Sequence, residues 1–186
     1  MEEIEFYLEE AKEGMEKAVA AVSHEMMRIR AGKASASMLD GITVEYYGAV
    51  TPLSQVSSVT TPDARTISIK PFEKSLINEI ERSIINSDLG LAPMNNGEMI
   101  ILTIPPVTEE RRKELVKQAK SEAENGKIRV RRVRQETNDA LKKLKGDGAS
   151  EDMIKDAEDS VQKLTNTYYG KIEEVFAKKE NDIMTV

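Results

Sequence analysis

The sequence predicts an α+β fold in which a long three-helix bundle carries a small mixed α/β unit as an insertion. Two observations lead to this prediction. Three long stretches of the 186-residue chain repeat apolar residues at steps of three and four, and the stretch between the first and the second alternates apolar and polar residues. Because one bundle helix precedes the α/β unit and two follow it, two adjacent chain segments join the unit to the bundle.

The first bundle helix is predicted from about Glu2 to Arg30. Its apolar residues form one seam that continues without a break for four heptads, which is typical of a helix packed in a bundle. The pattern ends at Ala31 and Gly32. The seam consists of Ile4, Leu8, Ala11, Met15, Ala18, Val22, Met26 and Ile29.

The inserted unit is predicted from the change of period between residues 42 and 104. Strands are expected around Ile42–Tyr46, Ile67–Ile69 and Met99–Ile104. Turn signals separate them at Gly48, Thr51–Pro52, Thr61–Pro62–Asp63 and Asn95–Asn96–Gly97. One helix is expected from about Glu73 to Ser87, before Gly90. Its buried face would be Leu76, Ile77, Ile80, Ile84 and Ile85.

Two further bundle helices follow the unit. Pro105 and Pro106 close it, since proline donates no ladder hydrogen bond and disfavours helix at the preceding residue. Thr108 is the expected N-cap of a helix that runs to Lys145, 38 residues or about 57 Å. Ser150 is the expected cap of the third helix. The two seams are Leu115, Ala119, Gly126, Val130, Val133, Thr137, Leu141 and Leu144, then Ile154, Ala157, Val161, Leu164, Tyr168, Ile172 and Val175.

These elements predict two domains. Residues 1–30 with 106–186 would form the bundle, and residues 31–105 the inserted α/β domain. The two joints, at Ala31–Gly32–Lys33 and at Pro105–Pro106, are at least domain boundaries. Two parallel connections at one point also permit the small domain to swing, so we interpret them as a hinge.

The composition excludes several classes of protein. The chain has no cysteine and one histidine, so a thiolate site, a His-based triad and a His-rich metal site are all excluded. His24 is interpreted as an ordinary surface residue, and the scattered glycines form no nucleotide-binding motif. We therefore expect no catalytic residue, no metal and no cofactor. No apolar run is long enough to span a membrane, and the acidic N-terminus is unlike a targeting peptide, which predicts a cytoplasmic protein.

The second bundle helix carries a basic stripe. The net charge is −6, yet residues 105–145 contain 13 Lys and Arg against 7 Asp and Glu. Four arginines lie between residues 129 and 134, and the planar guanidinium matches phosphate oxygens better than lysine does. The sorting to one face therefore indicates a phosphate-rich partner such as folded RNA. At steps of three and four, the stripe is Lys113, Lys117, Lys120, Glu124, Lys127, Arg131, Arg134, Asn138, Lys142 and Lys145.

A plainer interpretation of the stripe is a solvated face whose charges pair with acids on the neighbouring helices. Both neighbours are acidic, so some pairing is expected. Exposed pairs typically contribute less than about 1 kcal/mol, however, and pairing alone gives no reason for the sorting.

The sequence also resembles a known family, the bacterial ribosome recycling factors. Arg28–Ser35, Leu39–Gly48, Ser87–Leu91 and Pro105–Lys113 are similar to its motifs. Val130–Arg134 with Asn138–Asp139 is similar to the family's basic helix segment, and Val161–Thr165 to its third helix. The resemblance covers essentially the whole chain.

The resemblance implies an L-shaped protein with the bundle as one arm and a β/α/β sandwich as the other. It implies binding to the post-termination ribosome and, with elongation factor G and the GTP hydrolysis of that partner, subunit separation and release of mRNA and tRNA. The bundle would contact large-subunit ribosomal RNA, and elongation factor G would push the hinged domain. The protein itself would hydrolyse nothing, and we expect a monomer.

By position, the RNA-contacting arginines of the family fall on Arg30, Arg112, Arg131 and Arg134, and Lys127, Arg129 and Arg132 join them as further candidates from the same basic segment. Two positions depart from the family. Lys33 stands where an arginine is common and loses the bidentate fork, and Gln135 stands where a second arginine is common and loses the charge.

Two other classes stay open at this point. An adaptor protein would leave its helix seams partly exposed for exchange with a partner, and would form oligomers. An enzyme would need a polar pocket in the α/β unit, for which the sequence offers no obvious residues.

Overall fold

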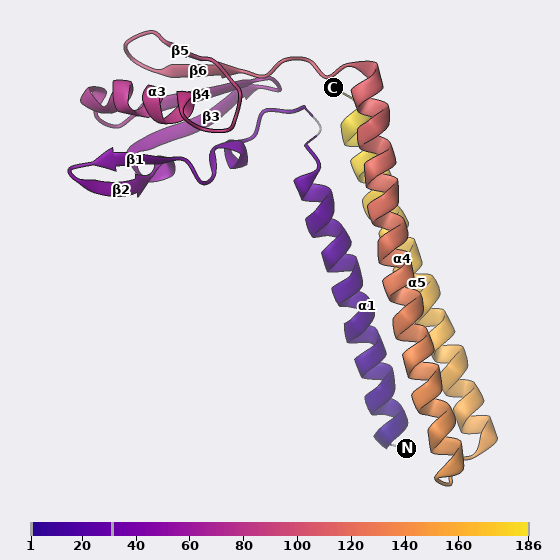
Figure 1. The fold of residues 1–186 in the computed structure, drawn as a ribbon. Coiled ribbons are helices and arrows are strands. Elements are labelled where there is room, and N and C mark those ends of the chain that lie inside the picture. The colour runs from indigo at the N-terminus through magenta and orange to yellow at the C-terminus, as the bar shows by residue number, and fades with distance from the viewer. Residues whose placement is uncertain (1, 31, 186) are drawn as a thin grey trace. The chain divides into compact units, whose positions relative to one another are not determined.

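The computed structural model describes residues 2–30 and 32–185, and these form two compact units (Figure 1). One unit comprises the described parts of residues 1–30 and 109–185. The other comprises the described parts of residues 31–108. The first is all helical, and the second combines two small sheets with short helices.

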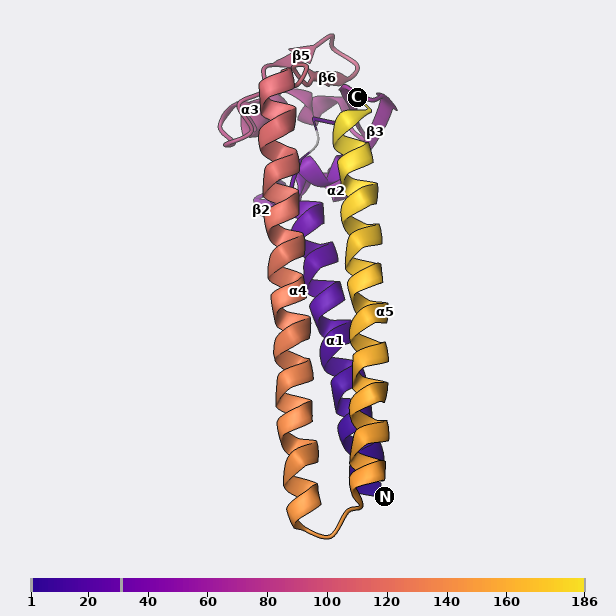
Figure 2. The same cartoon turned by 90° about the vertical axis from the view of Figure 1, so that its right-hand side faces the viewer.

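Three long helices form the first unit: α1 (Glu2–Arg28), α4 (Glu109–Gly146) and α5 (Glu151–Met184). Each packs against the other two. Figure 2 shows α4 and α5 side by side along their length, joined by a tight turn, with α1 behind them. The three-helix bundle expected from the seams is confirmed. The α1 helix ends two residues before its predicted end, and α4 begins and ends one residue later than predicted.

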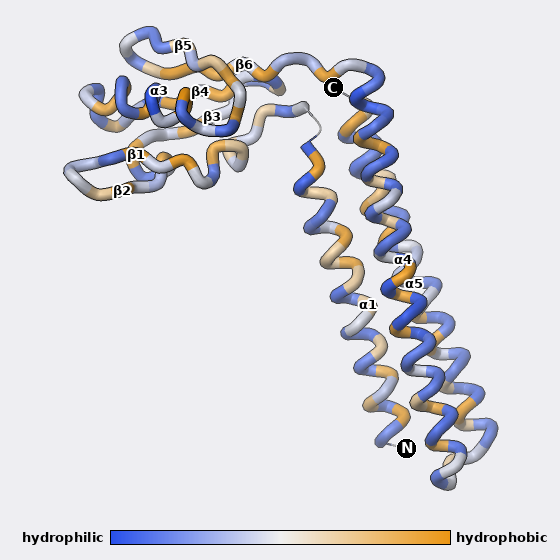
Figure 3. The backbone as a smooth tube through the Cα atoms, viewed as in Figure 1, coloured by the Kyte–Doolittle hydropathy of each residue, from blue (hydrophilic) through white to orange (hydrophobic). Residues whose placement is uncertain are grey.

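The seams form the core of this bundle. Apolar segments recur along all three helices in Figure 3. On α5 the seam differs from the prediction at two positions: Leu164 and Val175 are only half-buried, and Thr165 is buried in place of Leu164. The Thr165 hydroxyl donates to the Val161 carbonyl at 2.9 Å, so this polar group is hydrogen-bonded inside the core. The buried seam residues are Ala11, Met15, Ala18, Val22, Met26, Ile29, Leu115, Ala119, Ala123, Gly126, Val130, Thr137, Leu141, Leu144, Ile154, Ala157, Val161, Tyr168 and Ile172.

Gly126 allows the helices to approach closely in the middle of the bundle. A Cβ atom at this position would overlap Val22 Cγ2 on α1 and would lie 3.3 Å from Ile172 Cδ1 on α5. Glycine is normally unfavourable within a helix. Its presence here is explained by the absence of a side chain, which leaves room for two neighbours.

The start of α5 follows the prediction. Ser150 has extended backbone, and its hydroxyl accepts a hydrogen bond from the Met153 amide at 3.3 Å, as expected of an N-cap. Gly148, at φ +105°, completes the turn from α4, and the Ala149 amide donates to the Leu144 carbonyl at 3.1 Å.

The second unit contains an antiparallel four-stranded sheet in the order β3–β4–β6–β5 and a two-stranded hairpin of β1 and β2. Short helices surround these sheets. Ile67, Ile69, Ile80, Ile100 and Leu102 are fully buried at the centre of its core. The strands are β1 (Thr43–Tyr46), β2 (Ala49–Pro52), β3 (Ser57–Asp63), β4 (Thr66–Pro71), β5 (Pro93–Asn95) and β6 (Ile100–Thr103). The short helices are η1 (Ala36–Leu39), α2 (Leu53–Val56), η2 (Lys74–Leu76) and α3 (Ile77–Ile85).

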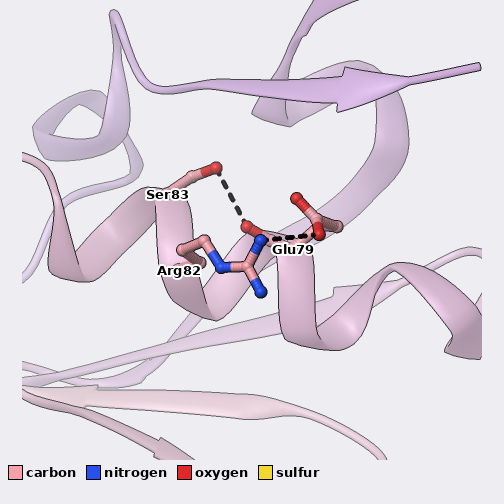
Figure 4. Close-up of polar contacts among 3 residues, drawn as sticks. All are labelled: Glu79, Arg82 and Ser83. Carbon is pink, nitrogen blue, oxygen red and sulfur yellow. Dashed lines mark hydrogen bonds and ion pairs between the residues drawn. The ribbon is translucent and has the colours of Figure 1, made fainter. Parts of the chain in front are cut away.

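The predicted helix of this unit is shorter than expected. It comprises the single turn η2 and then α3, which ends at Ile85 and not at Ser87. Ile77, Ile80 and Ile84 are buried as predicted, but Ile85 is 60% exposed, so its place in the buried face was wrong. Ile85 follows Ile84 by about 100° around the helix, which turns it out of the stripe. Figure 4 shows polar contacts within this helix: Arg82 Nη1 donates to Glu79 Oε1 at 3.2 Å, and the Ser83 hydroxyl donates to the Glu79 carbonyl at 2.9 Å.

Two of the predicted turns lie within strands. Thr51 and Pro52 end β2, and Thr61–Pro62–Asp63 belongs to β3, where the pairing with β4 shifts between Thr60 and Asp63. Proline is tolerated at strand ends and at such irregularities because no ladder hydrogen bond is required there. The predictions at Gly48 and Asn95–Gly97 were correct: Tyr47 and Gly48 form a two-residue hairpin turn with positive φ, and Asn96 Oδ1 accepts from the Glu98 and Met99 amides.

Candidate nucleic-acid interface

The basic stripe lies along the side of α4 that borders α5. Three contacts place it there: Lys127 pairs with Glu173, Arg134 with Gln162, and Lys145 with Glu151. The partners descend in number along α5 as the stripe ascends along α4, because the two helices are antiparallel neighbours (Figure 2). Of the predicted RNA-contacting residues, the structure brings Lys127, Arg131 and Arg134 onto this flank.

Two lysines of the stripe, Lys127 and Lys145, pair with acids. Lys127 is one-fifth exposed and pairs with Glu173 across the helices and with Glu124 at 3.6 Å. The hydrogen bond that Lys127 donates to Glu173 is the largest of the effects that raise the pKa of Lys127. Lys145 lies 2.5 Å from Glu151, and this hydrogen bond lowers the pKa of the Glu151 carboxyl. The pairing with neighbouring acids that the plainer interpretation expects is therefore present at these two positions.

The centre of the stripe is different. Arg131 is exposed, and no acid lies within ion-pair distance of it among the described residues. Arg134 is half-buried, and its Nη1 donates to the neutral Gln162 Oε1 at 3.4 Å. Gln162 Nε2 in turn donates to Asn166 Oδ1 at 3.0 Å. The two guanidinium groups at the centre thus have no carboxylate partner, and this leaves their positive charge available for phosphate oxygens.

The remaining candidates lie elsewhere on the bundle unit. Arg129 and Arg132 project from the flank of α4 opposite α5, and Arg132 Nε pairs with Glu136 Oε1 at 3.1 Å. Arg129 and Arg30 are exposed, and Arg112 is half-buried in the first turns of α4. The structure therefore does not gather all seven candidates into one patch.

The first joint between the units is anchored to the turn that connects β3 and β4. The Ala34 amide donates to the Ala64 carbonyl at 2.7 Å. Gly32 has φ +77°, and a Cβ there would overlap Val107 Cγ2 of the second joint. Lys33 is exposed, and Ala31 lies outside the described residues.

The second joint is anchored to the same turn. The Ile104 amide donates to the Arg65 carbonyl at 2.8 Å, and Pro105 and Pro106 are exposed in irregular backbone. These contacts of the joints with Ala64, Arg65 and Val107 could not be predicted from the sequence, because they join residues that are distant along the chain.

The described residues were also compared with the requirements of a metal site and of a membrane-spanning helix. Within residues 2–30 and 32–185, no three His, Cys, Asp or Glu side chains lie together as metal ligands would. None of the helices described is long and apolar enough to cross a membrane. His24 is exposed on α1.

The fold and this surface define a class: a helical bundle protein with an inserted α/β unit and an arginine-centred cationic face. The sequence profile of the ribosome recycling factor family matches residues 22–184. Ribosome-recycling factors of Christiangramia forsetii and Flavobacterium johnsoniae are 58% and 54% identical over 100% of this chain, and the matches cover 100% and 99% of those proteins. The chain belongs to the ribosome recycling factor family, whose members are non-enzymatic translation factors.

Solved structures agree with this assignment. A solution structure of the ribosome recycling factor is similar over 100% of both chains, with a TM-score of 0.76 and 36% identity. A second similar chain comes from models of the T. thermophilus ribosome recycling factor and the E. coli elongation factor G bound to the E. coli post-termination complex. It matches 97% of this chain and 98% of its own length, with a TM-score of 0.61 and 39% identity. The predicted fold class is confirmed.

Proposed function

We propose that this protein recycles ribosomes. It binds the post-termination ribosome and, with elongation factor G and the GTP hydrolysis of that partner, promotes subunit separation and the release of mRNA and tRNA. Membership in the family supports this function, as does the similarity to a factor placed with elongation factor G on a post-termination complex. Ribosomes are cytoplasmic in bacteria, so this is also where the protein acts.

One observation carries the RNA-binding part of the proposal: the unneutralised charge of Arg131 and Arg134. Lys127 and Lys145, on either side of this pair along α4, have acids within ion-pair distance, whereas these two arginines have none. A phosphate that approaches the centre therefore displaces no ion pair. Large-subunit ribosomal RNA is the proposed ligand of this face.

The two joints are proposed to act as a hinge between a bundle domain and an inserted domain. Ala34 and Ile104 are held by the turn between β3 and β4, so the residues free to change backbone angles are the few that precede Ala34 and follow Ile104. Mobile joints are commonly a few residues at the ends of secondary-structure elements. The hinge residues predicted from the sequence, Gly32, Lys33, Pro105 and Pro106, lie in these two short segments.

The adaptor alternative requires exposed seams, whereas every seam residue of the bundle is buried or half-buried within one chain. A monomer is therefore proposed, and sedimentation velocity over a range of concentrations tests it. A hollow in the α/β unit is lined mainly by apolar residues, with Ser37, Asp40 and Ser54 as its polar side chains. These three offer no pairing of a nucleophile with a base.

The test of the proposal is charge reversal of the central pair. The double variant Arg131→Glu/Arg134→Glu should lose most of its cosedimentation with bacterial large ribosomal subunits. The slope of log affinity against log salt should fall by about two, since roughly one counterion is released for each phosphate contact. A matched control, Lys12→Glu/Lys143→Glu, changes the net charge equally at exposed positions on α1 and on the opposite flank of α4. Wild-type affinity in the Arg131→Glu/Arg134→Glu variant would refute the RNA role of this face.

A further inference from the structure

The contacts between α4 and α5 point to a further part of the RNA-binding face. We propose that Gln162 and Asn166 of α5 complete the face around Arg131 and Arg134, and that their neutrality keeps the two arginines available for phosphate. The inference rests on the proposed function, because it assigns a second helix to the same RNA site. It also gives a role to the Val161–Thr165 segment, which the basic stripe does not include.

The residues that α5 presents to the stripe change in chemistry along the interface. Glu173 faces Lys127 and Glu151 faces Lys145, and each forms an ion pair. Between these positions, Gln162 faces Arg134 and bonds Asn166. The partner on α5 is thus a carboxamide at Arg134 and an acid at Lys127 and at Lys145. At 1.5 Å per residue, this amide segment is separated from the paired lysines by about 10 Å on one side and about 16 Å on the other.

The hydrogen bonds also fix the direction of both amides. A guanidinium can only donate, so the Gln162 oxygen must face Arg134 and its NH₂ group must face away. That NH₂ group donates to Asn166 Oδ1, which leaves the Asn166 NH₂ group at the exposed end of the chain of hydrogen bonds. The chain of hydrogen bonds that begins at Arg134 therefore ends in the N–H donors of Asn166, and donors are what phosphate oxygens require.

A carboxylate in place of Gln162 would have the opposite effect with almost no change of shape. It would pair with Arg134 as Glu173 pairs with Lys127. Both Gln162 and Asn166 are exposed, so the fold does not depend on their neutrality. The structure thus separates the stability of the bundle from its affinity for RNA at these two positions.

The experiment compares isosteric variants by binding to bacterial large ribosomal subunits between 50 and 200 mM salt. Gln162→Glu should weaken binding about eightfold near 0.1 M salt and lower the salt slope by about one, since one phosphate contact is neutralised. Asn166→Asp should act in the same direction. Glu173→Gln releases Lys127, so it should strengthen binding and raise the slope by up to one.

Gln118→Glu is the matched control, because it adds the same charge to an exposed position on the opposite flank of α4. The urea midpoint of unfolding should be the same in all four variants. If the amides had a purely structural role, the midpoint would fall in Gln162→Glu and Asn166→Asp. The inference is overturned if Gln162→Glu and Asn166→Asp bind like Gln118→Glu while Arg131→Glu/Arg134→Glu loses binding. If the arginine variant also binds normally, the proposed RNA face itself is wrong.

Discussion

Gly126 offers a sharp test of how closely the three helices pack. Replacing glycine by alanine within a helix normally stabilises it by about 1 kcal/mol. Here the added Cβ would overlap Val22 Cγ2 and approach Ile172 Cδ1 at 3.3 Å. Val22 is β-branched and 2% exposed, so it has little freedom to move aside. Overpacking of this kind costs about 1–3 kcal/mol, and we expect Gly126→Ala to destabilise the bundle by about 1 kcal/mol net.

The chain supplies its own controls for this substitution. Gly170 lies within α5 with nothing within 4 Å of its added Cβ, so Gly170→Ala should stabilise by the full helix preference of about 1 kcal/mol. Gly14 is intermediate, because Val133 Cγ2 would lie 3.2 Å from the new atom, and its variant should be close to neutral. The effects of Gly126→Ala and Gly170→Ala on the free energy of unfolding should therefore differ by about 2 kcal/mol.

Urea unfolding followed by circular dichroism at 222 nm is the appropriate assay, since the bundle helices dominate that signal. A double-mutant cycle adds a second criterion. Val22→Ala should cost less in the Gly126→Ala background than in the wild type, because removal of the methyl groups relieves the overlap. Equal stabilisation by Gly126→Ala and Gly170→Ala, with no coupling to Val22, would refute the close approach of α1 and α4.

Two further predictions concern a buried tyrosine and the hinge. Burial, and after it the hydrogen bond to Glu16 Oε1 at 3.0 Å, raises the pKa of the Tyr168 hydroxyl. The protonated hydroxyl therefore contributes its full stabilisation of the folded state below about pH 10. This contribution is lost as the pH rises through the folded-state pKa. Tyr168→Phe should therefore cost about 1 kcal/mol at pH 7. Its urea midpoint should converge on the wild-type value above pH 10, and a constant difference would contradict this. Small-angle scattering of the wild type should require more than one arrangement of the two domains, and a single rigid arrangement that fitted the data would contradict the hinge.

The long helices could be predicted closely because their signal is local and repeated. In α1, α4 and α5 the seam recurs over many turns. Both ends predicted for α1 and α4, and the start predicted for α5, lie within two residues of the observed ones. The short strands were harder. The strands β2 and β5 have no fully buried residue, and β3 has only Ser57, so none of them shows an alternation of apolar and polar residues. β2 pairs with β1, β5 with β6 and β3 with β4, and no local sequence pattern indicates these partners.

Part of the candidate site could likewise be predicted from the sequence, and part could not. The sequence alone places Arg131 and Arg134 on one face of a helix, because helical spacing is a property of neighbouring residues. Which of the stripe's charges are neutralised depends on α5, whose facing residues lie 28 and 46 positions away from Arg134 and Lys127. The antiparallel packing of α4 and α5 brings Glu173 to Lys127 but Gln162 to Arg134. The sequence thus determined where positive charge gathers, and only the tertiary structure decided where it stays free, since ion pairing requires contact between distant parts of the chain.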